Sequence, residues 1–212
     1  MSEKPLTANA PNSIPSVSRE RLFKGAKFDF ERLTVPGSDG RPLTREIIRH
    51  PGAVVILPIL DSPSSASGEP HVVLIKNWRI SLETWLYELP AGTIEKGEEA
   101  AACAARELEE ETGYTAATIT LLCRFYSSPG MSDEQMWLYA ATGLTSVGQR
   151  LELDERVTVH PMPLSNALAM INSGELVDGK SILALLLAQV RGIFPAPQVF
   201  GSNRMQPRAG QV

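Results

Sequence analysis

GTIEKGEEAAACAARELEEETGY, residues 92–114, carries the clearest structural signal in this chain of 212 residues. The stretch opens as a loop, because Gly92 and Gly97 interrupt any regular element. Residues 98–112 contain neither Gly nor Pro and are mostly Ala, Glu, Leu and Arg, a composition that favours a helix. Gly113 supplies a C-terminal stop. The sequence therefore predicts a loop that leads into a helix over residues 98–112.

Three glutamates, Glu107, Glu110 and Glu111, are spaced at i, i+3 and i+4 and so share one face of the predicted helix. The residues expected to face the core lie about a quarter turn or more away and are Ala101, Ala105, Leu108 and Thr112. Like charges at this spacing destabilise an isolated helix by roughly 0.2–0.5 kcal/mol per pair. A divalent cation would remove that cost, because Mg²⁺ binds carboxylate and phosphate oxygens. The plainer interpretation, which the acidic run alone favours, is a solvated helix end.

The fixed positions of this stretch resemble the Nudix box, G-x5-E-x7-R-E-U-x-E-E-x-G-U, in which U is an aliphatic residue. Gly92 and Glu98 fill the first two positions, residues 106–108 fill R-E-U, and residues 110–113 fill E-E-x-G. Tyr114 is the one departure, at the final U. The resemblance implies an α+β fold of the Nudix type, an α/β/α sandwich with a mixed sheet. It also implies a metal-dependent hydrolase of nucleoside diphosphates that are linked to another group.

Segments beside the box resemble the ADP-ribose pyrophosphatase subfamily of the Nudix group. Arg79, in NWR, resembles the end of a Q-[YF]-R element with Asn and Trp as departures, and Glu88 begins a match to E-[LF]-P-A-G. Pro129 lies sixteen residues beyond Gly113, in the loop SSPGMSDE, like a marker proline of that subfamily. In relatives the arginine contacts the substrate, and the carbonyl of the alanine, here Ala91, is a metal ligand.

The resemblance implies a metal centre on the predicted helix with a substrate site around it. The implied ligands of Mg²⁺, for which Mn²⁺ is a substitute, are the Ala91 carbonyl, Glu107, Glu110 and Glu111. The implied catalytic residues are Glu155, Glu110 and Arg106, of which Arg106 braces the loop and helix together with Glu98. The implied substrate-binding residues are Arg79, Glu88, Arg45, Gly130 and Met131.

The general base is expected in the acidic segment LELDER, residues 151–156. Relatives place a catalytic glutamate in a loop shortly before the strand and helix that end the domain, and counting back from residues 162–164 reaches Glu155. Glu152 and Asp154 have the same intrinsic claim to the role. Some relatives instead use the glutamates of the box.

The composition is that of a globular protein, with 43% hydrophobic residues, 21% charged residues and a net charge of −4. No block of Lys and Arg is present, which argues against a nucleic-acid partner. No apolar run approaches the roughly 18 residues of a membrane span, and the N-terminus has no signal-peptide pattern. Cys103 and Cys123 are expected to be free thiols in a reducing compartment, so a cytoplasmic location is expected.

Four segments are expected along the chain: a disordered leader at 1–18, an N-terminal β-hairpin at 19–50, a Nudix domain at 51–195 and a flexible tail at 196–212. Strand patterns within the domain occupy residues 52–60, 71–76, 83–89, 118–126, 135–142 and 157–162. Two further helices are expected at 164–173 and 180–191.

The hairpin, with strands at 27–35 and 43–50, is expected to mediate dimerisation. A lone two-stranded hairpin is marginally stable in water, and this one has more apolar side chains than it can bury within itself. Those side chains are Phe28, Phe30, Leu33, Ile47 and Ile48. Relatives use the region in a two-fold dimer, so we expect a homodimer with Arg45 or Arg49 near the partner's active site.

The expected activity is Mg²⁺-dependent hydrolysis of ADP-ribose to AMP and ribose 5-phosphate. One alternative keeps the chemistry and changes the substrate to GDP-mannose or another nucleotide sugar. A more distant alternative is a non-catalytic Nudix module that senses a metabolite or binds a partner. The complete set of box glutamates favours an enzyme over such a module.

Overall fold

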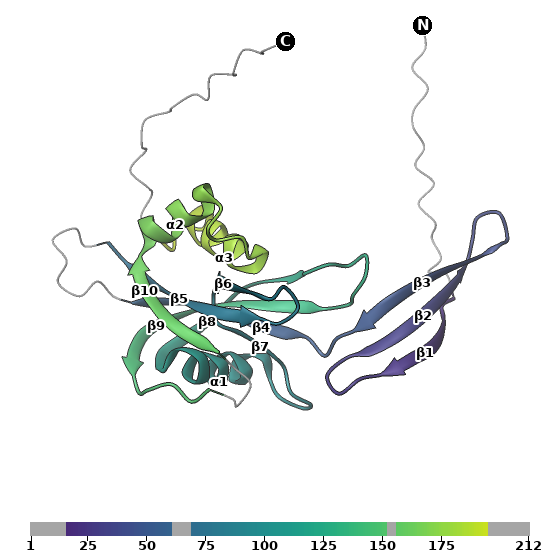
Figure 1. Cartoon of the computed structure of the whole chain (residues 1–212), viewed down its shortest axis with the longest axis horizontal. Coiled ribbons are helices and arrows are strands. Elements are labelled where there is room, and N and C mark those ends of the chain that lie inside the picture. The colour runs from purple at the N-terminus through teal and green to yellow at the C-terminus, as the bar shows by residue number, and fades with distance from the viewer. Residues whose placement is uncertain (1–15, 61–68, 152–155, 195–212) are drawn as a thin grey trace, which may run out of the picture.

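The structure, a computed structural model, describes residues 16–60, 69–151 and 156–194 (Figure 1). The small sheet contains β1 (Ser18–Lys24), β2 (Asp29–Pro36) and β3 (Pro42–Arg49). The large sheet contains β4 (Ala53–Leu60), β5 (His71–Arg79), β6 (Thr84–Glu88), β7 (Ala91–Thr93), β8 (Tyr114–Tyr126), β9 (Gln135–Ser146) and β10 (Val157–Pro163). The helices are α1 (Ala100–Thr112), α2 (Leu164–Ser173) and α3 (Gly179–Val190), and none of these described helices is long and apolar enough to cross a membrane.

The large sheet is mixed and has β4 at its centre. Its strand order is β10-β5-β4-β9-β8, with β6 paired to β5 and β7 paired to β4. Strands β4 and β9 run parallel, whereas β8 and β9, and β5 and β10, run antiparallel. A strand in this position is covered on both faces, which explains why β4 is a nearly continuous apolar run, AVVILPIL.

Alternate residues of β4 supply two hydrophobic cores, one on each face of the sheet. Val55 and Leu57 pack on the side of α2 and α3, whereas Val54 and Ile56 pack on the side of α1. Each fully buried side chain of this kind contributes roughly 1.5–3 kcal/mol. The helices lie on opposite sides of the sheet in Figure 1, and the expected α/β/α sandwich is confirmed.

Helix α1 ends as expected, at Gly113 in the left-handed conformation with φ 71°. It begins two residues later than expected, because the Glu98 N–H donates to the Glu95 carbonyl in a turn. The expectation that Ala101 and Ala105 face the core is wrong: both are exposed. Leu108 and Thr112 are buried as expected, and the same side of the helix carries Glu107 and Glu111, which are only 8% and 3% exposed.

The small sheet has three strands, because β1 is added to the expected pair of β2 and β3. Its polar face is held by ion pairs across the strands: Arg32 donates to Glu20 at 3.2 Å and to Glu46 at 3.0 Å. The strand β1 is exposed and rich in charge, so the sequence lacks the hydrophobic alternation that predicts a half-buried strand.

The end of the small sheet is attached to the loop between β8 and β9. The Ile48 N–H donates to the Met131 carbonyl at 2.9 Å, and the Asp133 N–H donates to the Ile48 carbonyl at 3.3 Å. Arg49 donates through Nη1 to Asp133 Oδ2 at 2.5 Å and through Nε to Glu31 Oε2 at 2.8 Å. The small sheet, which extends to one side in Figure 1, is thereby fixed next to this loop.

One row of apolar side chains crosses the small sheet. The register aligns Phe23 with Phe30, and Phe30 with Ile48. Phe23 is 65% exposed and Phe30 is 38% exposed. An exposed aromatic row on a small sheet favours an interface, and it is consistent with the predicted homodimer.

We expect Phe23→Glu to weaken a homodimer by about tenfold or more, because a charge placed on an aromatic anchor must be desolvated in the interface. The fold should be unchanged, since Phe23 is exposed. Light scattering at graded protein concentrations measures the effect, with Val190→Glu, 83% exposed on α3, as the control. A wild-type protein that is monomeric at micromolar concentration contradicts the prediction.

Candidate active site

Two buried glutamates of α1 lie against the backbone of β7. The carboxylate of Glu107 occupies the space beside Gly92, where an added Cβ would stand 1.9 Å from the carboxyl carbon. Glu111 accepts a hydrogen bond from the Ala91 N–H at 2.8 Å. Residue 92 must therefore be glycine for the carboxylate of Glu107 to approach the strand.

Arg106 places one positive charge among three surrounding glutamates. Its Nε and Nη2 form a two-point contact with Glu98, at 2.9 and 3.0 Å. Its Nη1 donates to Glu107 Oε1 at 2.8 Å and to Glu110 Oε2 at 3.0 Å. The hydrogen bond from Arg106 lowers the pKa of Glu98 to about 2, so Glu98 is ionised at neutral pH. The loop that precedes α1 and the acidic face of α1 are thus joined by one guanidinium, as expected of a brace.

The carboxylate and carbonyl oxygens near β7 suit a hard cation that takes some of its ligands from the protein and the others from the substrate. Within the described residues, no three or more Asp, Glu, His or Cys side chains converge as a ready-made metal site. Mg²⁺ characteristically binds one or two carboxylates together with substrate phosphates, rather than a cage built by the protein alone. Glu107 and Glu111 fit that pattern, and Glu111 is hydrogen bonded to the backbone of the implied ligand residue Ala91.

A second ionic cluster surrounds Glu88, which is 1% exposed. Arg79 contacts both of its carboxylate oxygens, with the Nε–Oε1 distance at 2.7 Å, and Lys180 donates to Oε2 at 2.7 Å. Burial by itself would raise the pKa of Glu88, but the hydrogen bond from Arg79 and the charge of Lys180 outweigh burial and lower it. Glu88 is therefore an anion, and it lines the cleft together with its two cationic partners.

A cleft of about 740 Å³ brings several of the predicted residues together. Its lining includes Arg79, Glu88 and Ala91, with Gly92 beside them. Of the other predicted substrate residues, Arg45, Gly130 and Met131 are described by the structure but do not line this cleft. Gly130 and Met131 lie in the loop whose ends, Ser127 and Glu134, do line it. Glu155, Glu152 and Asp154 lie outside the described residues, so the choice of base stays a prediction.

The cleft also contains His50 and Lys180, which sequence reasoning did not select. The Nδ1 of His50 accepts from the Gly52 N–H at 3.0 Å, and its Nε2 is 3.3 Å from Glu134 Oε1. Its ring is stacked on Phe28 at 4.6 Å. Burial lowers the pKa of His50 although Glu134 and Asp133 oppose that shift, so His50 is neutral and presents Nε2–H to Glu134.

Comparisons with known proteins identify the family of this chain. Residues 49–176 match the family model of the NUDIX domain. This chain belongs to the Nudix family. It is 38% identical over 178 residues to an ADP-ribose pyrophosphatase of Bacillus subtilis (strain 168). The aligned region covers 83% of this chain and 92% of the relative. It is 35% identical over 178 residues, with the same coverage, to a methanol dehydrogenase activator of Bacillus methanolicus.

The fold of this Nudix protein also matches a solved structure. A crystal structure of an ADP compounds hydrolase superposes with a TM-score of 0.70 at 20% sequence identity, over 85% of this chain and 97% of that one. The resemblance inferred from the box is confirmed, and the chain is a Nudix hydrolase. The individual site assignments stay predictions.

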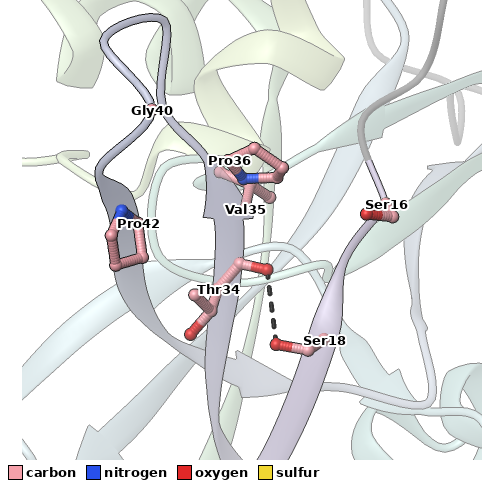
Figure 2. Close-up of a pocket in the computed structure, with 7 residues that line it drawn as sticks. All are labelled: Ser16, Ser18, Thr34, Val35, Pro36, Gly40 and Pro42. Carbon is pink, nitrogen blue, oxygen red and sulfur yellow. Dashed lines mark hydrogen bonds between the residues drawn. The ribbon is translucent and has the colours of Figure 1, made fainter.

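A second hollow, of about 280 Å³, lies on the small sheet of the Nudix protein. Figure 2 shows its lining, with the Ser18 hydroxyl donating to the Thr34 carbonyl at 3.5 Å. Its lining residues are Ser16, Ser18, Thr34, Val35, Pro36, Gly40 and Pro42. None of these side chains titrates near neutral pH, so this hollow offers no acid or base for hydrolysis.

We expect Gly92→Ala to abolish most of the hydrolase activity, because the new methyl group occupies the position of the Glu107 carboxylate. The clash should also cost about 1–3 kcal/mol of stability. Denaturant unfolding followed by activity assays measures both effects. Gly179→Ala is the control for stability, since a Cβ at Gly179 meets no heavy atom of the described structure within 4 Å. Wild-type turnover in Gly92→Ala would show that Glu107 need not approach β7.

Proposed function

We propose that this Nudix hydrolase cleaves the diphosphate bond of a nucleoside diphosphate sugar, with ADP-ribose as the preferred substrate. The products are AMP and ribose 5-phosphate. The observation that carries the proposal is the inward-facing carboxylate pair, Glu107 and Glu111. The pair packs against Gly92 and Ala91 of β7, two residues that line the cleft together with Arg79. Support for ADP-ribose comes from the relatives and from the Arg79, Glu88 and Pro129 segments.

The cleft suits a ligand of this size and charge. Its volume of about 740 Å³ lies within the roughly 300–1,000 Å³ of typical small-molecule sites. Arg79 is held by Glu88 through Nε and Nη2, and these contacts fix the orientation of its guanidinium. The Nη1 group carries two further N–H donors, and we assign one of these to an oxygen of the substrate.

The residues that would hold Mg²⁺, or Mn²⁺ in its place, are Glu107, Glu110, Glu111 and the Ala91 carbonyl. When bound, the metal neutralises phosphate charge and lowers the pKa of the attacking water. The carboxylates that would bind the metal have different hydrogen-bond donors. Glu110 accepts a hydrogen bond from the Arg106 side chain, whereas Glu111 accepts one from the Ala91 N–H. Glu155 is the proposed acceptor of the water's proton, and Glu152 and Asp154 are the alternatives.

Activity across a substrate panel tests this proposal. Initial rates are measured with ADP-ribose, GDP-mannose and a nucleoside triphosphate, each with Mg²⁺ and with EDTA. We expect kcat/KM for ADP-ribose to exceed that for GDP-mannose by about tenfold or more, and EDTA to abolish both activities. A preference for GDP-mannose would show that ADP-ribose is not the preferred substrate and would assign the enzyme to GDP-mannose instead. Hydrolysis of none of these substrates would favour a non-catalytic module and overturn the proposal.

We expect Glu111→Gln to lower kcat by about a hundredfold or more, because it removes one anionic metal ligand while a side-chain oxygen remains to accept from Ala91. The fold should persist, since glutamine matches glutamate in size and helix propensity. Steady-state rates at saturating Mg²⁺, with circular dichroism as the check on folding, measure the effect. Turnover close to that of the wild type would refute the assignment of Glu111 as a ligand.

A further inference from the structure

The first turn of α3 forms a polar cluster outside residues 49–176, the part of the chain that matches the family model. Asp178 caps the helix: its Oδ2 accepts from the Ser181 N–H at 3.1 Å and from the Ser181 hydroxyl. Lys180 donates to the same oxygen at 2.9 Å. An N-cap accounts for the contacts between Asp178 and Ser181, but it does not account for Lys180 or for the contacts that leave the helix.

Two of those contacts reach the end of β6 and the residue that follows it. Lys180 Nζ donates to Glu88 Oε2 at 2.7 Å, and the Leu89 N–H donates to the Ser181 hydroxyl oxygen at 2.7 Å. Ser181 and Leu89 are both fully buried. Each contact joins residues that are 92 positions apart in the sequence. The first turn of α3 therefore holds one side chain and one backbone group of this segment.

The segment Glu88-Leu89-Pro90-Ala91 connects the two halves of the site. At its start, Glu88 orients Arg79; at its end, the Ala91 N–H is bonded to Glu111. Pro90 lies between them, and its ring restricts the backbone, while its carbonyl accepts from the Ile56 N–H of β4 at 2.9 Å. A displacement at Glu88 or Leu89 is thus transmitted over a short, stiff path to Ala91.

Charge balance makes Lys180 necessary at this position. Glu88 and Asp178 supply two negative charges, and Arg79 and Lys180 supply two positive charges. Without Lys180, Glu88 and Asp178 would have only the positive charge of Arg79 to balance them, and Glu88 would lose one of its two cationic partners. Removing a partner from a buried carboxylate is destabilising, so Glu88 would be driven to move or to take up a proton. In either case Arg79 would lose its fixed orientation.

We propose that Lys180, supported by Asp178 and Ser181, is a positioning residue for hydrolysis, acting through Glu88 on Arg79 and on the Ala91 segment. This inference rests on the proposed function in that it takes Arg79 and Ala91 to serve the reaction. In this proposed role, Lys180 does not itself touch the reacting atoms. Its effect on catalysis therefore depends on the presence of the Glu88 carboxylate.

A double-mutant cycle tests that dependence. We expect Lys180→Met to lower kcat/KM for ADP-ribose by about tenfold or more in the wild type, and by less than about twofold in a Glu88→Gln background. Lys76→Met is the matched control, because Lys76 lies on β5, over the Tyr87 ring and away from the cleft. A full effect of Lys180→Met in both backgrounds, or no effect in the wild type, overturns the proposal. If Lys180→Met does not fold, Lys180→Gln, which keeps N–H donors for both carboxylates, takes its place in the cycle.

Amide hydrogen exchange supplies a readout that does not need activity. We expect the Leu89 and Ala91 amides to exchange about tenfold faster or more in Lys180→Met and in Ser181→Ala, and at the wild-type rate in Lys76→Met. Unchanged exchange at both amides overturns the proposal even where kcat/KM falls. Should the wild type hydrolyse none of the panel substrates, the proposed function fails, while the exchange measurement still decides whether Lys180 positions the segment.

Discussion

The contact of Arg106 with three glutamates is the interaction on which the site depends. Glu98 comes from the loop before α1, whereas Glu107 and Glu110 come from the helix itself, and the one guanidinium contacts all three. Without this positive charge, the acidic face of α1 would be forced apart and toward solvent. With it, the helix can turn that face inward, which places Glu107 against Gly92 and Glu111 against Ala91.

Side chains from both helical layers contact the segment from Glu88 to Gly92. Helix α1 approaches it with carboxylates from one side of the sheet, and the first turn of α3 approaches it with Lys180 and Ser181. The Glu88 cluster is electrically balanced, with two carboxylates and two cations, so its charges can be buried with their partners in place. The Arg106 cluster has three carboxylates to one guanidinium and keeps an excess of negative charge. In the proposed mechanism, α1 supplies the metal-binding oxygens, and the first turn of α3 holds the strand segment and, through Glu88, Arg79.

Much of this arrangement was predictable from local sequence. The box predicted α1 and its glycine stop, α2 was expected at 164–173 and lies there, and the apolar run of β4 predicted a buried strand. Local patterns failed where charge replaced apolar periodicity, as in the exposed strand β1. They also failed for Ala101 and Ala105, because the buried face of α1 is centred on Cys103, Ala104 and Leu108 and includes the carboxylates of Glu107 and Glu111.

The contacts of Lys180 and His50 could not be predicted, because their partners are distant in the sequence. Lys180 meets Glu88 across 92 positions, and His50 meets Glu134 through the attachment of the small sheet to the loop after β8. A lone lysine near a helix start, or a lone histidine at the end of a strand, carries no local signal of such a partner. Only the topology of the sheets brings these groups to one cleft.

Metal binding by the box carboxylates can be measured without substrate. Mn²⁺ is titrated into the wild type and into Glu107→Gln, and free Mn²⁺ is followed by electron paramagnetic resonance. We predict saturable binding by the wild type and an affinity that is weaker by about tenfold or more in the variant, because an anionic ligand is lost. Equal binding by the two proteins would contradict this prediction.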